Sequence, residues 1–137
     1  MYAEKESFSV HEEQPVLVCV TGQKSCDRLI KTGAQLAAGL SAPLLVVHVA
    51  PAGAPLLGNS TQSEALNYLY SMSCEVGAEM AVLRAPDTLE RLILYAQEQH
   101  VAHIVIGAGR PEGPDRRDVA ALLRMRLPHV QVHVVIL

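Results

Sequence analysis

The chain has 137 residues, enough for one domain with a buried core. Half of the residues are hydrophobic but only 4% are aromatic, a composition typical of a parallel sheet buried between helices. The formal net charge of −3, the absence of a basic stripe and the absence of an apolar run of roughly 20 residues predict no nucleic-acid partner and no direct membrane insertion.

The first segments of the chain predict a tail followed by the start of an α/β domain. Residues 1–14 are polar and aperiodic, so we expect a flexible tail, with a single domain over 15–137. An apolar run over Val16–Thr21, closed by Gly22, predicts a buried strand. Ser25 is placed to cap the helix that follows and reaches Leu40.

The rest of the chain repeats this alternation of strand and helix. A capping box at Thr61–Glu64 opens a helix that Gly77 can end, and Asp87 starts another helix through Ala96. The connector Ala50–Asn59 is read as either a lid or a mobile linker. The remaining expected elements are strands at Leu44–Val49, Glu79–Arg84, His103–Gly107 and Val130–Leu137, and a helix at Val119–Arg126.

Alternating strands and helices with right-handed crossovers predict a parallel sheet between two helical layers. Ligands of such sheets bind at the carboxyl ends of strands, where the winding direction reverses. With the first strand central, this crevice lies between Thr21-Gly22 and Gly107-Ala108-Gly109. Glycine lets a backbone approach a ligand closely, and the helix N-terminus that follows attracts anions.

Several catalytic and nucleotide-binding patterns can be tested at this crevice. The glycines at 107, 109 and 113 are spaced one residue too far apart for a dinucleotide fingerprint, and they follow the fourth strand instead of the first. The carboxylates of a phospho-acceptor domain are absent from the ends of strands one and three. A flavin-type phosphate loop over Thr21–Ser25 is weak but stays open. No nucleophile–base pair, paired carboxylates or metal cluster is placed here, so we expect no enzyme.

Five of the eight arginines fall between residues 110 and 126, interleaved with acidic residues. Arg110, Arg116 and Arg117 could grip a phosphate, or they could belong to a solvated loop with local ion pairs. His48, at the end of the second strand, could hydrogen-bond a base or a ribose, or serve as a structural contact.

The three cysteines show no CxxC pair and no metal-ligand spacing. An odd number of cysteines without a signal peptide predicts a reducing, cytoplasmic location. Cys26, in the first turn of a predicted helix, is a conceivable redox sensor but more typical of a small buried residue. Cys19 and Cys74 are expected in the core. His129 and His133 share no spacing with a cysteine or a carboxylate, so no metal site is expected.

Several segments of residues 15–137 together resemble one family. They are Val16–Gly22, Asp27–Ile30, Ala42–Leu44, Val47–Val49, Asp87–Ala96, His103–Gly107 and Leu127–Val135. Their pattern resembles the universal stress protein (Usp) superfamily. Within it, the chain is most similar to the Usp-like domain in the cytoplasmic part of Kdp-type osmosensitive potassium-channel sensor histidine kinases.

The resemblance implies an adenine nucleotide alpha hydrolase-like fold. This fold is a five-stranded parallel sheet of order 3-2-1-4-5 with helices on both faces. It also implies a non-catalytic stress or signalling role, often as a dimer. Many members bind ATP or AMP, and some kinase-linked domains bind a cyclic dinucleotide. The implied partners are therefore a second copy and a sensor kinase.

The chain departs from the nucleotide-binding members at most of their contact positions. Thr21 stands where they carry an acidic residue, and Arg110 stands where they carry the second glycine of Gly-x-x-Gly. Arg117-Asp118 replaces their Gly-Ser or Gly-Thr. Gln23 and His48 replace hydroxyl and aromatic residues of some cyclic-dinucleotide binders. Only Gly107 matches, so another anion held by the arginines is a further candidate ligand.

The last strand carries apolar side chains on both of its faces. When such a strand lies at the edge of a sheet, a partner usually covers it. The family's dimer forms through this strand and would place Val130, Val132, His133 and Val134 at a two-fold contact. A contact with another part of a larger kinase is the rival interpretation. The candidate ligand site consists of Thr21, Gly22, Ser25, His48, Gly107, Ala108, Gly109, Arg110 and Arg117. A ligand-free interaction module and a redox-responsive protein through Cys26 are the alternatives.

Overall fold

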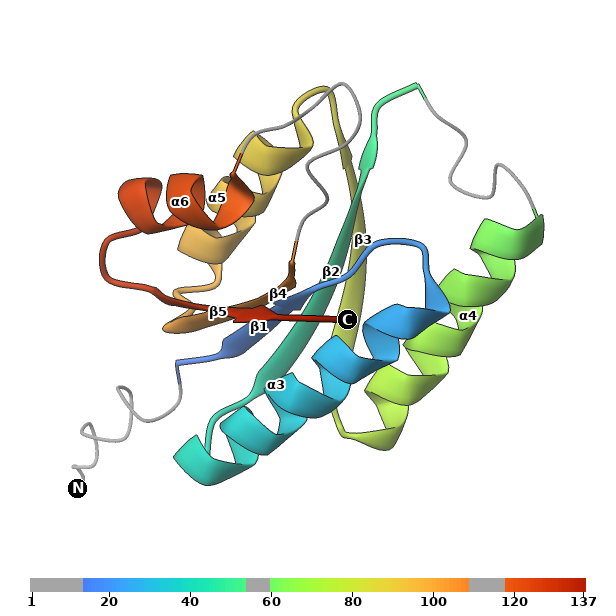
Figure 1. The fold of residues 1–137 in the computed structure, drawn as a ribbon, viewed down its shortest axis with the longest axis horizontal. Helices are drawn as coiled ribbons and strands as arrows, with labels where there is room; N and C mark the ends of the chain where they lie inside the picture. The colour runs from blue at the N-terminus through green and yellow to red at the C-terminus, as the bar shows by residue number, and fades with distance from the viewer. Residues whose placement is uncertain (1–13, 54–59, 109–117) are drawn as a thin grey trace.

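The computed structural model of the chain describes residues 14–53, 60–108 and 118–137 (Figure 1). Its five strands form one sheet of order β3-β2-β1-β4-β5 in which every neighbouring pair is parallel. The strands are β1 (Val16–Cys19), β2 (Leu44–Pro51), β3 (Glu79–Ala85), β4 (His103–Gly107) and β5 (Gln131–Val135). The strand order and parallel pairing confirm the predicted fold class. Most of the expected tail and of the 50–59 connector, and the arginine-rich loop 109–117, lie outside the described residues.

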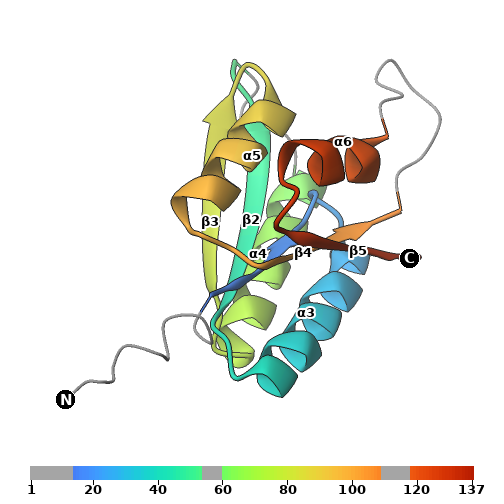
Figure 2. The ribbon, with the colours of Figure 1, turned by 90° about the vertical axis from the view of Figure 1, so that its left-hand side faces the viewer.

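Helices cover both faces of the sheet, as Figure 1 and Figure 2 show. One face carries α3 (Asp27–Leu40), preceded by the short 3-10 helix η1 (Lys24–Cys26), together with α4 (Ser60–Glu75). The other face carries α5 (Thr88–Glu98) and α6 (Val119–Arg126). No helix within the described ranges is long and apolar enough to cross a membrane.

The central strand β1 supplies both halves of the core because its side chains alternate between the two faces. Leu17 packs in the cluster under α5 and α6, whereas Val16 and Val18 pack in the cluster under α3. All three are fully buried. Gly33 of α3 lies directly over Val18: a Cβ built at Gly33 would be 2.3 Å from Val18 Cγ2. The absence of a side chain at residue 33 therefore sets how closely α3 approaches the sheet.

Two of the expected helix starts are wrong in detail. Ser25 does not cap a helix: it lies inside η1, whose N-cap residue is Gln23, and α3 follows from Asp27. The tight 3-10 turn, closed by the Cys26 N–H donating to Gln23 O at 3.1 Å, takes the place of a side-chain cap. Likewise α4 already begins at Ser60, which puts Thr61 within the helix.

The expected end of α4 is confirmed. The helix ends at Glu75, and Gly77 has a positive φ of 77°, the left-handed conformation that glycine adopts without strain. The Ala78 N–H then donates to Ser73 O at 2.8 Å and closes the last turn.

Asp87 caps α5 as expected, because its Oδ1 accepts from the N–H groups of Leu89 and Glu90, each at 3.1 Å. We expect Asp87→Ala to lower the unfolding free energy by about 1 kcal/mol, since these two N–H groups lose their acceptor. Asp87→Ser, which keeps an oxygen acceptor, should lose clearly less. Urea unfolding of both variants checks this, and equal losses would contradict the capping role.

Candidate functional site

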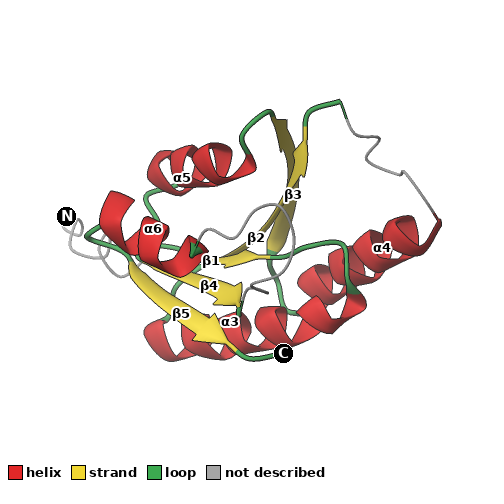
Figure 3. Cartoon of the chain, turned by 45° about the horizontal axis from the view of Figure 1, so that its top comes forward, coloured by secondary structure: helices red, strands yellow, loops and turns green. Residues whose placement is uncertain are grey.

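The direction of winding reverses at β1. The chain runs from β1 outward to β2 and β3, then returns to β4 on the other side of β1 and continues to β5. All five strands are parallel, so the loops that leave β1 and β4 start at the same edge of the sheet (Figure 3). This is the edge at which ligands bind in open α/β sheets.

The loop after β1 is held by its own short contacts. The Gln23 N–H donates to Thr21 O at 2.8 Å, and the Thr21 N–H donates to Cys26 Sγ at 3.4 Å. The Thr21 hydroxyl is also 3.4 Å from that sulfur. These contacts leave the Thr21 and Ser25 side chains exposed at the sheet edge and end β1 at Cys19, two residues before the expected boundary.

Gly22 allows the closest approach between this loop and α4. A Cβ at Gly22 would be 2.9 Å from Gln62 Cγ, closer than side chains tolerate. Next to this contact is an open hollow of ≈ 520 Å³ lined by Gly22, Gln23, Thr61 and Gln62. Gly22 was expected to line the ligand crevice, and the structure shows that the space beside it holds the Gln62 side chain of α4.

His48 of β2 lies just beyond the carboxyl end of β1, on the face of the sheet covered by α3 and α4. Its side chain is 7% exposed, and its Nδ1 is 3.0 Å from Val20 O. A carbonyl oxygen only accepts hydrogen bonds, so Nδ1 carries a hydrogen, and in the tautomer with hydrogen on Nδ1 alone Nε2 is an acceptor. Nε2 is buried without a hydrogen-bond partner among the described residues. A buried acceptor without a donor is unfavourable, which makes this atom a place where a ligand donor would be stabilised.

The end of β4 is more closed than the sequence suggests. A Cβ at Gly107 would be 3.1 Å from Leu137 Cδ1 and 3.6 Å from Leu29 Cδ1, so apolar side chains lie over this glycine on the α3 face. The Ala108 N–H donates to Val135 O at 2.9 Å and is therefore used within the sheet. Of the other predicted residues of this loop, Gly109, Arg110 and Arg117 lie outside the described residues, as does Arg116.

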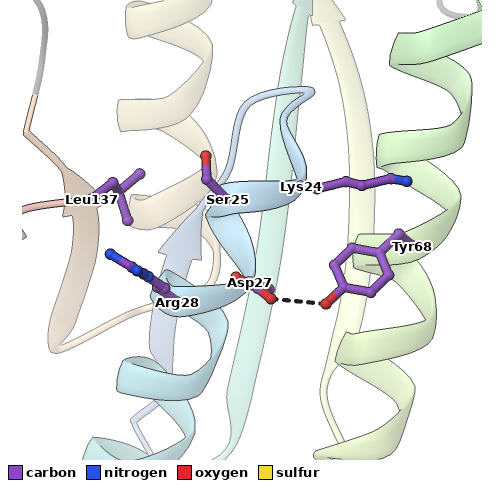
Figure 4. Close-up of a pocket in the computed structure, with 6 residues that line it drawn as sticks. All are labelled: Lys24, Ser25, Asp27, Arg28, Tyr68 and Leu137. Carbon is purple, nitrogen blue, oxygen red and sulfur yellow. Dashed lines mark hydrogen bonds between the residues drawn. The ribbon is translucent and has the colours of Figure 1, made fainter.

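A second open hollow, of ≈ 690 Å³, lies over the start of α3 (Figure 4). It is lined by Lys24, Ser25, Asp27, Arg28, Tyr68 and Leu137. Tyr68 of α4 donates to Asp27 Oδ2 at 2.8 Å, and this hydrogen bond is the main reason why the pKa of Tyr68 is raised. Lys24 and Arg28 bring two positive charges to this hollow. The sequence did not indicate this group, because Asp27 and Tyr68 meet only through the packing of α3 on α4.

The cysteines differ in exposure. Cys26 is buried, as expected, and burial raises the pKa of Cys19 to about 12, so that thiol stays protonated. Cys74, expected in the core, is exposed on α4, which corrects that prediction.

Over the described ranges no three His, Cys, Asp or Glu residues are grouped so that they could hold a metal ion.

The predicted dimer residues lie on both sides of β5, which ends at Val135 instead of Leu137. Val132 is buried in the cluster under α6, so its side chain faces its own core. Val130 is half-buried, and His133 Nε2 is 3.0 Å from His103 Nδ1. Val134 is 44% exposed and the following Ile136 is 82% exposed. The exposed apolar surface beside the outermost strand β5 therefore comes from Val134 and Ile136.

The parallel sheet of order β3-β2-β1-β4-β5, with helices on both faces, places the chain among the doubly wound α/β proteins. The sequence profile described as "Universal stress protein family" matches residues 13–134, and the chain belongs to this family. No curated protein matches the chain.

Solved structures of the same family share the fold. A universal stress protein from Archaeoglobus fulgidus is 23% identical, with a TM-score of 0.66 over 88% of this chain and 92% of that one. The universal stress protein from this organism in complex with dAMP is 22% identical, with a TM-score of 0.64 over 88% of this chain and 96% of that one. A universal stress protein in complex with cAMP is 19% identical, with a TM-score of 0.63 over 90% of this chain and 96% of that one.

Proposed function

We propose that this chain is a non-catalytic stress or signalling domain whose crevice at the carboxyl ends of β1 and β4 takes a small regulatory ligand, with an adenine nucleotide as the first candidate. We also assign it to the cytoplasm. The observation that carries the proposal is the buried, unpartnered Nε2 of His48 at this edge. The dAMP and cAMP complexes of similar structures support the choice of ligand class.

The chemistry of the site limits what the ligand can be. The Nε2 acceptor of His48 requires a donor, and a nucleoside supplies one through its amino group or its hydroxyls. Lys24 of η1 and Arg28 of α3 line the hollow over the start of α3 and would attract the phosphate. Thr21, where nucleotide-binding relatives are acidic, gives no carboxylate to hold a ribose. We therefore expect weaker binding than in those relatives.

A thermal-shift series with AMP, dAMP, cAMP, ATP and a cyclic dinucleotide tests this proposal. At a ligand concentration of 100 times the dissociation constant, binding to the folded state adds about 2.7 kcal/mol of stability and raises the melting temperature. His48→Leu removes the acceptor and should reduce the shift, whereas His48→Gln, which keeps an acceptor, should retain more of it. No shift with any of these ligands at millimolar concentration would contradict the proposal.

The second candidate is a ligand-free dimerisation or interaction module of a sensor-kinase system, in line with the resemblance to Kdp-type kinases. It is favoured by the exposed Val134 and Ile136 at the edge of the sheet. A homodimer through β5 would cover them. Sedimentation of the wild type should then show a concentration-dependent dimer that Ile136→Asp weakens. A monomer at all concentrations would contradict the homodimer. If nucleotides also cause no thermal shift, a contact with another protein is the form of interaction module that is left.

A further inference from the structure

Two histidine rings join the edge strand β5 to β4. His103 Nδ1 is 3.0 Å from His133 Nε2, and the ring centroids are 5.3 Å apart. His103 lies opposite Gln131, and His133 lies opposite Val105, so the contact runs diagonally across the pair of strands. The two rings thus add a side-chain hydrogen bond to the backbone ladder that holds β5.

This hydrogen bond depends on protonation. One of the two facing nitrogens must carry a hydrogen and the other must be free to accept it, an arrangement that exists with both rings neutral or with one ring charged. When both rings are charged, all four nitrogens carry hydrogens, so the hydrogen bond is lost and two positive charges face each other. Burial, and then the positive charge of His133, lower the pKa of His103 below its ordinary value of 6.5.

The charged group that acts on the pKa of His103 is His133 and not a carboxylate, and Glu98, at the end of α5, pairs with Arg91 at 3.3 Å. Strands β1 and β5 contain no charged residue apart from His133 itself. The charged residues of α3 are Asp27, Arg28 and Lys31, all in its first two turns, near the carboxyl ends of the strands; His103 begins β4 at the opposite end. On the other face, Arg124 of α6 donates to Val132 O at 3.2 Å and adds a further positive charge near β5. His100 and His129 lie at the same end of the sheet and are exposed.

We propose that the His103–His133 pair is a pH-sensitive link that strengthens the attachment of the edge strand β5 to β4 near neutral pH and weakens it on acidification. The direction follows from linkage: an unfolded histidine takes up its proton at about pH 6.5, whereas His103 in the folded chain does so at lower pH. The unfolded or locally opened state therefore binds more protons below pH 6.5. The link is fully present above that pH and is lost as the pH falls through the lowered value.

Hydrogen exchange measures the link where it acts. We expect the protection factors of the β5 amides, corrected for the intrinsic exchange rate, to fall between pH 7.5 and pH 5.5 by up to about tenfold, the limit set by one histidine with an unfolded pKa near 6.5. His133→Gln removes the second charge but leaves His103 partly buried, so it should reduce this pH dependence without abolishing it. His129→Gln, which removes an exposed histidine four residues earlier, should behave like the wild type.

Histidine ring NMR of the wild type gives a readout that needs no variant to fold. The His103 ring should titrate below pH 6.5, and its midpoint should rise in His133→Gln and stay unchanged in His129→Gln. Either of two results would overturn the proposal: a His103 midpoint that His133→Gln does not move, or β5 protection that falls equally with pH in His133→Gln and in the wild type.

Discussion

Leu123→Ala is expected to lower the unfolding free energy by about 2–5 kcal/mol, the usual cost of removing a fully buried leucine. Leu123 is 0% exposed and packs in the cluster that joins α6 to the sheet, together with Leu127 and Val132. Because α6 has only eight residues, few other contacts can replace the lost one. Urea unfolding monitored by circular dichroism measures the change.

The matched control lies on the same helix. Met125 is 67% exposed, so Met125→Ala removes a side chain of similar size without opening a cavity. Its unfolding free energy should stay within about 0.5 kcal/mol of the wild type. Similar losses for the two variants would mean that α6 does not pack on the sheet through Leu123.

Gly33→Ala is the second substitution with a large expected effect. Its new Cβ would lie 2.3 Å from Val18 Cγ2, and Val18 is fully buried in the central strand. Overpacking of this kind costs about 1–3 kcal/mol, and larger side chains such as Leu should cost more. Replacing glycine by alanine within a helix favours folding by about 0.8–1 kcal/mol, so the net loss for Ala should be smaller than the steric cost.

Gly39→Ala separates these two contributions. A Cβ at Gly39 meets nothing within 4 Å, and this residue belongs to the same helix. The variant should therefore gain up to about 1 kcal/mol in urea unfolding, because only the helix propensity changes. A gain of the same size at Gly33 would show that α3 can move away from β1 at little cost.

The fold could be predicted from the sequence because each element carries its own local signal. The buried strands are short apolar runs, Asp87 and Gly77 mark helix ends, and strict alternation of strand and helix leads to a parallel sheet. The errors lie at element boundaries. Ser25 has the chemistry of a cap, but the chain enters α3 through a 3-10 turn, a choice that sequence pattern alone does not distinguish.

The site was harder to predict because its contacts join distant parts of the chain. Nothing near Gly107 in the sequence indicates that Leu137 lies over it, and nothing near Gly22 indicates Gln62. The hydrogen bond between Tyr68 and Asp27 depends on the packing of α3 against α4. His48 could be named as a candidate from its place at a strand end, but its tautomer and its unpartnered Nε2 required the position of Val20 O.

NMR of the backbone amides during a titration with dAMP shows whether a small ligand binds at the carboxyl ends of β1 and β4. We expect saturable shifts concentrated at Thr21, Gly22 and Gly107, with a weaker response in His48→Leu. Saturable shifts confined to other surfaces, such as the β3 edge or the outer face of α5, would contradict binding at this site.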